Sequence, residues 1–122
     1  RARAIAAAIA CEAQPFGNLR IVNYLKDEAG FSDEQRVSFL NRWVGGALKA
    51  VEQMAREPAG RFCIGDAPTL ADVFLVPQLA TARRFNVDLA GCATLLAIDE
   101  NCAKLAAFQK ARPENQPDAV KS

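Results

Sequence analysis

Arginines are the side chains of this sequence whose chemistry is most suggestive. Arg83 and Arg84 directly follow a hydrophobic stretch, and Arg20 lies in an earlier apolar segment. A guanidinium group presents a planar fork of donors that can bind a carboxylate through two hydrogen bonds. Adjacent arginines at the end of a helix can also be solvated cations that complement the helix dipole. The pair therefore predicts either an anion-binding position or an ordinary helix end.

The rest of the chemical inventory is small. The sequence has no histidine, which removes the usual general base and the commonest metal ligand. It also has no glycine-rich phosphate loop, no Cys/His metal spacing and no Ser/His/Asp set. Asp72 resembles a buried catalytic carboxylate, but a capping role at the start of a helix explains it fully. The residues by themselves predict no metal site and no catalytic residue.

The two adjacent arginines must be positioned by residues 65–88, which read as a capped, buried helix. Thr69 and Asp72 have the spacing of a capping box, in which each side chain accepts from the backbone N–H of the other residue. The stretch that follows, residues 70–80, is apolar almost all round. We therefore expect this helix to lie in the middle of its domain.

The remaining chain also predicts helices. A capping box at Ser32 opens a long helix with apolar residues at three- and four-residue steps, and no stretch shows the period of two that a strand requires. Residues 14–18 are a polar, kinked stretch that by itself reads as a loop. The sequence predicts an all-α bundle of five to six helices in one domain, with helices at residues 1–13, 19–28, 32–56, 65–88, 94–101 and 103–111 and a polar tail at 112–118 laid over the surface.

The composition excludes several classes of function. Lys and Arg number 15 against 14 Asp and Glu, so a dedicated binder of nucleic acid or of a membrane surface is not expected. No apolar run is long enough to span a bilayer. The cysteines form no Cys-x-x-Cys pair, which predicts buried free thiols in a reducing, cytoplasmic compartment. These cysteines are Cys11, Cys63, Cys92 and Cys102.

The first residues bear on domain organisation. The chain opens in strong helix-forming sequence, without an initiator methionine and without a capping residue in front of it. This pattern is typical of a helix that continues a longer polypeptide. We therefore expect another domain to precede residues 1–122.

Several segments together resemble a known family. Residues 62–72, with the sequence FCIGDAPTLAD, resemble the capping segment in the C-terminal helical domain of glutathione transferases. Residues 75–78, 82–89, 107–109 and 112–118 are more narrowly similar to the zeta class of that family, which includes maleylacetoacetate and maleylpyruvate isomerases. The resemblance covers essentially the whole chain.

The resemblance implies a two-domain, usually dimeric cytosolic enzyme. In this family a thioredoxin-like N-terminal domain holds glutathione and carries an activating serine, while the helical domain supplies the wall of the acceptor-substrate site. Residues 1–122 would then be the single helical domain, with glutathione as cofactor and the thioredoxin-like domain and a second copy as partners. The chain alone is expected to be inactive, because the thiol-activating half lies elsewhere.

The resemblance also implies roles for individual residues. Matched position by position, Gln14 and Asn18 reach towards glutathione, and Arg20 and Arg84 hold the carboxylates of the substrate. In the implied reaction, the thiolate of glutathione adds to the cis double bond of a maleyl compound, the resulting single bond rotates, and elimination gives the trans fumaryl product. Guanidinium groups suit this substrate because they position its carboxylates and stabilise the developing charge.

Two other functions stay open at this point. One is a broader zeta-type glutathione transferase that acts on small electrophiles such as 2-haloacids in the same pocket. The other is a helical module that binds proteins without catalysis. A thioredoxin-like domain with a serine near its start, encoded before Arg1, would favour an enzyme over a binding module.

Overall fold

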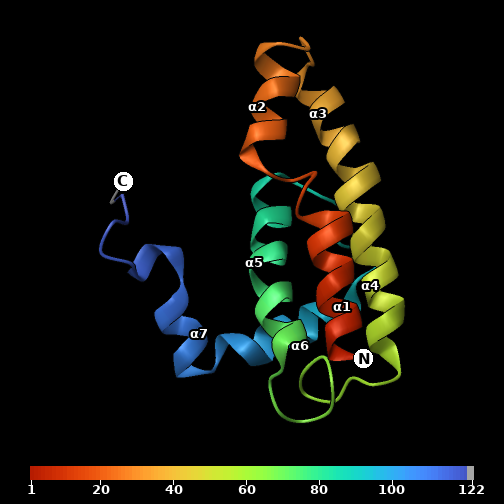
Figure 1. Cartoon of the computed structure of the whole chain (residues 1–122), viewed down its shortest axis with the longest axis vertical. Coiled ribbons are helices and arrows are strands. Elements are labelled where there is room, and N and C mark those ends of the chain that lie inside the picture. The colour runs from red at the N-terminus through yellow and green to blue at the C-terminus, as the bar shows by residue number, and fades with distance from the viewer. Residues whose placement is uncertain (121–122) are drawn as a thin grey trace.

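The structure is a computed structural model that describes residues 1–120. Within this range it contains helices joined by turns and loops and no strand (Figure 1). Because α1 continues into η1, and α3 continues through η2 into α4, the elements form six helices, which confirms the predicted all-α bundle. The α-helices are α1 (Ala2–Ala8), α2 (Leu19–Asp27), α3 (Asp33–Leu40), α4 (Gly46–Arg56), α5 (Leu70–Arg84), α6 (Ala93–Ala103) and α7 (Ala106–Ala111), the π-helical segments are η1 (Ile9–Ala13) and η2 (Asn41–Gly45), and η3 (Pro113–Asn115) is a 3-10 helix.

The hydrophobic core lies between α1, α4, α5 and α6. Helix α5 packs against α1 and α6, and α4 packs against α1 and α6 as well (Figure 1). The core side chains come from all four helices and from η1, and the largest of them are Ile5, Ile9, Leu48, Leu75, Leu79, Leu95 and Ile98. Helix α5 therefore occupies the central place that its sequence predicts.

The N-terminus of α5 is closed by the predicted capping box. The Asp72 carboxylate accepts from the N–H of Thr69 at 2.7 Å, and the Thr69 hydroxyl accepts from the N–H of Ala71 at 3.3 Å. The same carboxylate accepts from the N–H of Cys63 at 2.8 Å. Asp72 is fully buried, so these donors offset the cost of removing its charge from water. The capping role of Thr69 and Asp72 is confirmed.

Helix α5 is not buried on every side, contrary to the expectation from its composition. The side chains of Leu70 and Val73 are 48% and 55% exposed. The reason is that α1, η1 and α6 cover the other faces of α5, and no element of residues 1–120 covers this one.

Helix α6 is capped by a side chain from another helix. It begins at Ala93 and has no side-chain cap from its own N-cap residue. Instead, the buried Glu52 of α4 accepts from the backbone N–H of Thr94 at 3.3 Å and of Leu95 at 3.1 Å, and Nε of Arg56 lies 3.3 Å from the same carboxylate. This contact fixes α6 against α4, because free N–H groups at a helix start require acceptors.

The C-terminal segment differs from the expectation. Helix α7 begins at Ala106 rather than 103, and the following turn extends away from the bundle instead of lying over it (Figure 1). Side-chain amides hold this segment together: Gln109 donates to the carbonyl of Ala103, Asn115 to that of Gln109, and Gln116 to those of Lys110 and Arg112. The polar residues that predicted surface contacts therefore bond to their own segment.

Stability is expected to depend on the ionisation of Glu52. Burial raises its pKa, but the hydrogen bonds from Thr94, Leu95 and Arg56 outweigh burial and hold the pKa below the ordinary value of 4.5. Ionised Glu52 therefore stabilises the fold fully above pH 4.5. This stabilisation is lost as the pH falls through the lower pKa that Glu52 has in the folded state. In urea unfolding at several pH values, Glu52→Gln should be less stable than the parent chain at neutral pH, and this difference should shrink in acid. A difference that is constant with pH would contradict the role of Glu52.

Candidate functional site

The candidate site residues lie in the turn after η1 and at two helix ends. Gln14 and Asn18 flank the turn that joins η1 to α2, Arg20 lies in the first turn of α2, and Arg84 is the last residue of α5. All four are exposed.

A close packing contact brings these elements to the same end of the bundle. Gly17 in the turn is buried against α5, and a Cβ atom placed on it would lie 3.3 Å from Cγ2 of Thr81. A side chain at position 17 would therefore push the turn away from α5. Arg20 lies shortly after Gly17 and Arg84 shortly after Thr81 in the sequence, and the start of α2 lies next to the end of α5 in Figure 1.

Two surface hollows of the bundle lie elsewhere. One is lined by Asp33, Glu34, Val37, Ser38 and Asn41, and the other by Ala8, Glu12, Arg42, Trp43, Gly46, Ala47 and Ala50. Neither includes Gln14, Asn18, Arg20 or Arg84. The two hollows therefore do not test the predicted site, which stays a prediction.

Asn18 has a structural role that the sequence analysis did not assign. Its side-chain oxygen accepts from the N–H of Arg20 at 2.9 Å, which makes Asn18 the N-cap of α2. An asparagine directly before an apolar helical series is the sequence signal for this role. The cap fixes the start of α2, and with it the backbone position of Arg20, while the side-chain N–H₂ group of Asn18 can still donate.

The structure distinguishes the two adjacent arginines. Nη1 of Arg83 lies 2.7 Å from the Asp99 carboxylate, so this residue joins α5 to α6. The guanidinium of Arg84 lies over the Phe85 ring, 5.6 Å from its centroid, and forms no ion pair within residues 1–120. Asn86 then takes a left-handed conformation, with φ of 56°, and ends the helix. Of the two, Arg84 is the one whose charge is available to a ligand.

Three of the four cysteines are buried thiols that do not act as nucleophiles. Burial, followed by the negative charge of Asp72, raises the pKa of Cys63 and raises that of Cys102 to about 12. Burial also raises the pKa of Cys92. These three thiols are free and buried, as predicted, and stay protonated at neutral pH. Cys11 is free but exposed, because it lies on the outer side of η1, so its predicted burial is wrong.

Within residues 1–120, no three His, Cys, Asp or Glu side chains are grouped so that they could hold a metal ion. None of the helices in that range has the length and apolar character needed to cross a bilayer.

Comparison with known proteins finds close similarity. No model of a protein family matches the chain. The chain is 44% identical over 115 residues to maleylacetoacetate isomerase of Rhizobium meliloti, an alignment that covers 93% of this chain and 54% of that relative. The chain therefore spans about half the length of such relatives.

Solved structures give the same result for the fold. A holo structure of maleylpyruvate isomerase, a bacterial glutathione transferase of the zeta class, superposes with a TM-score of 0.91 at 38% identity, covering 98% of this chain and 57% of that one. Maleylacetoacetate isomerase of Anaeromyxobacter dehalogenans, with dicarboxyethyl glutathione and citrate in its active site, superposes with a TM-score of 0.87 at 41% identity, covering 98% and 54%.

The capping role of Asn18 can be tested by its effect on the stability of the chain. Asn18→Ala should lower the free energy of unfolding by about 1 kcal/mol, because the first turn of α2 loses its cap. Asn18→Asp should keep most of the stability, since its carboxylate can accept the same bond, but it removes the donating N–H₂ group. Urea unfolding of both variants measures this difference. Equal stability of the alanine variant and the parent chain would contradict the cap.

Proposed function

Since this chain is homologous over nearly its full length to zeta-class glutathione transferases, we propose that it is the substrate-binding helical domain of a glutathione-dependent cis-trans isomerase. The substrate class is a maleyl dicarboxylate such as maleylacetoacetate or maleylpyruvate, an intermediate in the breakdown of aromatic compounds. The observation that carries this proposal is the similarity to isomerases at 44% identity and with a TM-score of 0.91.

The proposal includes a division of labour between two domains. Residues 1–122 form the helical domain, and a thioredoxin-like domain of the same parent protein holds glutathione and activates its thiol with a serine. The length of the relatives supports this arrangement, because the chain matches only 54% of the Rhizobium enzyme. We also propose that the intact protein is a cytoplasmic homodimer, a location with which three buried free thiols are consistent.

Glutathione fits the polar groups that this chain offers. Gln14 is exposed and presents an amide, and Asn18 retains its N–H₂ donor beside the cap. Such neutral donors suit the peptide carbonyls and carboxylates of a tripeptide. When bound, glutathione supplies the thiolate that adds reversibly to the double bond of the substrate. Gln14 and Asn18 would bind the part of glutathione that lies nearest the helical domain.

The arginines of this chain would hold the substrate. Arg84 makes no ion pair within residues 1–120, and Arg20 lies in the first turn of α2, whose start is next to the end of α5 in Figure 1. Each guanidinium can bind one carboxylate, which would place the double bond for addition of the thiolate and guide rotation about the single bond that the addition leaves. The same positive charge stabilises negative charge that develops on the substrate during the reaction.

Replacement of Arg84 should affect turnover more than cofactor binding. In the intact parent enzyme, Arg84→Ala should cost about 2 to 4 kcal/mol of transition-state stabilisation, because one carboxylate loses its partner. This corresponds to a loss of roughly 30- to 900-fold in kcat/KM for the dicarboxylate. Glutathione affinity should change little.

The matched control for this experiment is Arg83→Ala. Its charge is already paired with Asp99, so the variant should lose some stability but keep most of the turnover. Equal, small effects of the two substitutions on kcat/KM would count against the assignment of Arg84.

The division of labour predicts that residues 1–122 are inactive by themselves. The purified chain should not isomerise maleylacetoacetate in the presence of glutathione, because the proposal places the thiol-activating serine in the thioredoxin-like domain. The full-length parent should act on maleylacetoacetate or maleylpyruvate in preference to a 2-haloacid. Product formation is followed by absorbance, and isomerisation by the chain alone would refute the proposed allocation.

A further inference from the structure

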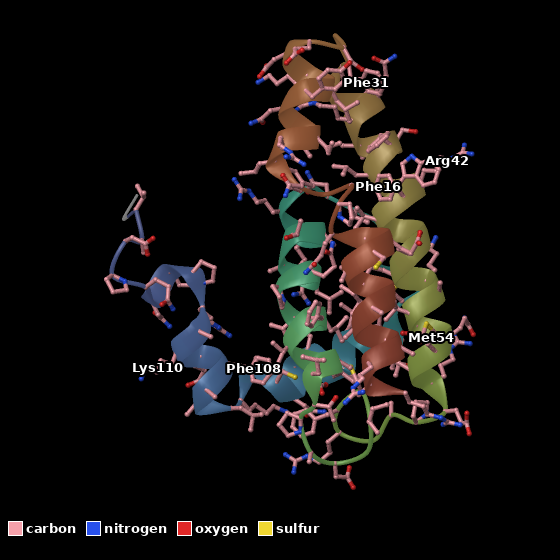
Figure 2. All side chains as sticks on the ribbon, viewed as in Figure 1. Phe16, Phe31, Arg42, Met54, Phe108 and Lys110 are labelled. Atoms are coloured by element: carbon pink, nitrogen blue, oxygen red, sulfur yellow. The ribbon has the colours of Figure 1, made fainter. Side chains whose placement is uncertain are left out.

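The end of α5, which carries Arg84, is held from another part of the chain. Residues 85–88 follow the helix and cross to the continuous helix formed by α3, η2 and α4 (Figure 1). There the side-chain oxygen of Asn41, the first residue of η2, accepts from the backbone N–H of Asp88 at 2.7 Å. Figure 2 shows Arg42, the residue after Asn41, on the outer side of this helix at the level of Phe16.

A second contact with η2 supports the same segment. Val87 is buried, and a Cβ atom placed on Gly45 would lie 3.3 Å from Cγ1 of Val87 and 3.8 Å from Oδ1 of Asn41. Val87 and the amide oxygen of Asn41 therefore pack over a position that has no side chain. Gly45 is the last residue of η2, as Asn41 is the first. A hydrogen bond and an apolar contact with this π-helical segment thus hold the chain after α5.

These contacts reach Arg84 through the hydrogen bonds that close α5. The N–H of Asn86 donates to the carbonyl of Arg83 at 3.2 Å, and the N–H of Val87 donates to that of Ala82 at 2.9 Å. With Asn86 in the left-handed conformation, this pair of bonds is a Schellman motif, in which the chain after a helix folds back on its last turn. Because Val87 belongs to the motif and also contacts η2, a shift of Val87 moves the last turn of α5 and the backbone of Arg84.

We propose that Asn41 is a positioning residue for the isomerisation, which holds Arg84 where a carboxylate of the substrate binds. Asn41 acts through Asp88 and the turn after α5, not by contact with the substrate. The inference rests on the proposed function, because it concerns the role of Arg84 in that reaction. Without the bond the last turn of α5 is less firmly held, and a small displacement of an orienting group lowers the rate of a reaction that depends on alignment.

A double-mutant cycle in the intact parent enzyme tests the proposal. With maleylacetoacetate, or with maleylpyruvate where the parent prefers it, Asn41→Ala should lower kcat/KM about tenfold, because Arg84 is less well aligned. In an Arg84→Ala background, the same substitution should change kcat/KM by less than about twofold, since the group that Asn41 positions is already absent. The affinity for glutathione should be the same in the parent and in these variants.

Two further variants separate positioning from stability. Asn41→Asp keeps an oxygen that can accept from Asp88, so its kcat/KM should stay near that of the parent. Asn101→Ala is the matched control, because the side-chain amide of Asn101 donates to the carbonyl of Arg61 at 3.0 Å, in the segment before α5 and at the opposite end of that helix from Arg84. In urea unfolding it should lose stability as Asn41→Ala does, but its kcat/KM should not fall.

The Arg84→Ala variant separates failure of this inference from failure of the proposed function. If Arg84→Ala lowers kcat/KM but Asn41→Ala does not, or lowers it equally in both backgrounds, the positioning role is wrong and the proposed function stands. A loss in Asn41→Asp as large as in Asn41→Ala would also overturn the positioning role. If Arg84→Ala has no effect, the proposed role of Arg84 fails and this inference fails with it.

The folded state of each variant is checked by circular dichroism. Asn41→Ser replaces the alanine variant if that variant is not folded, because the serine oxygen lies one atom closer to the backbone and does not reach Asp88. It should then show the same loss of kcat/KM and the same dependence on Arg84, and parent-like turnover in Asn41→Ser would contradict the proposal.

Discussion

The buried carboxylate of Asp72 is the interaction on which the arrangement of the bundle depends. It accepts from the N–H of Thr69 at the start of α5 and from the N–H of Cys63, which lies nine positions before Asp72. A charge at this depth would be unfavourable without such donors, and the helix dipole adds to its stabilisation. Because the bonds tie the connecting segment to the first turn, they set where α5 begins.

The sequence predicted those parts of the fold that depend on local signals. The capping boxes at Ser32 and Thr69 are determined by residues three positions apart, and both are present. The π-helical segments could not be predicted, because the apolar spacing of a short π turn is nearly the same as that of an α-helix. The cap that Glu52 places on α6 joins residues more than forty positions apart, and no local pattern records such a contact.

The sequence named the residues of the candidate site, which stay a prediction, but it did not give their geometry. The resemblance to zeta-class proteins selected Arg20 and Arg84, and the forked shape of guanidinium explained why arginines would be chosen. The sequence could not separate Arg83 from Arg84, since the difference comes from Asp99 on α6. It also gave no sign that Trp43 would be exposed, because the apolar stripe of a helix does not reveal which part of it finds a neighbour.

The two ends of the chain are built differently. Ile5 and Ile9, close to the first residue, are core side chains, whereas α7 touches the bundle through α6 and the partly buried Leu105 and Phe108. The amides of Gln109, Asn115 and Gln116 satisfy carbonyls of their own segment. An affinity tag, a fluorophore or a fused reporter is therefore best attached after the last helix, where the added mass displaces no core contact.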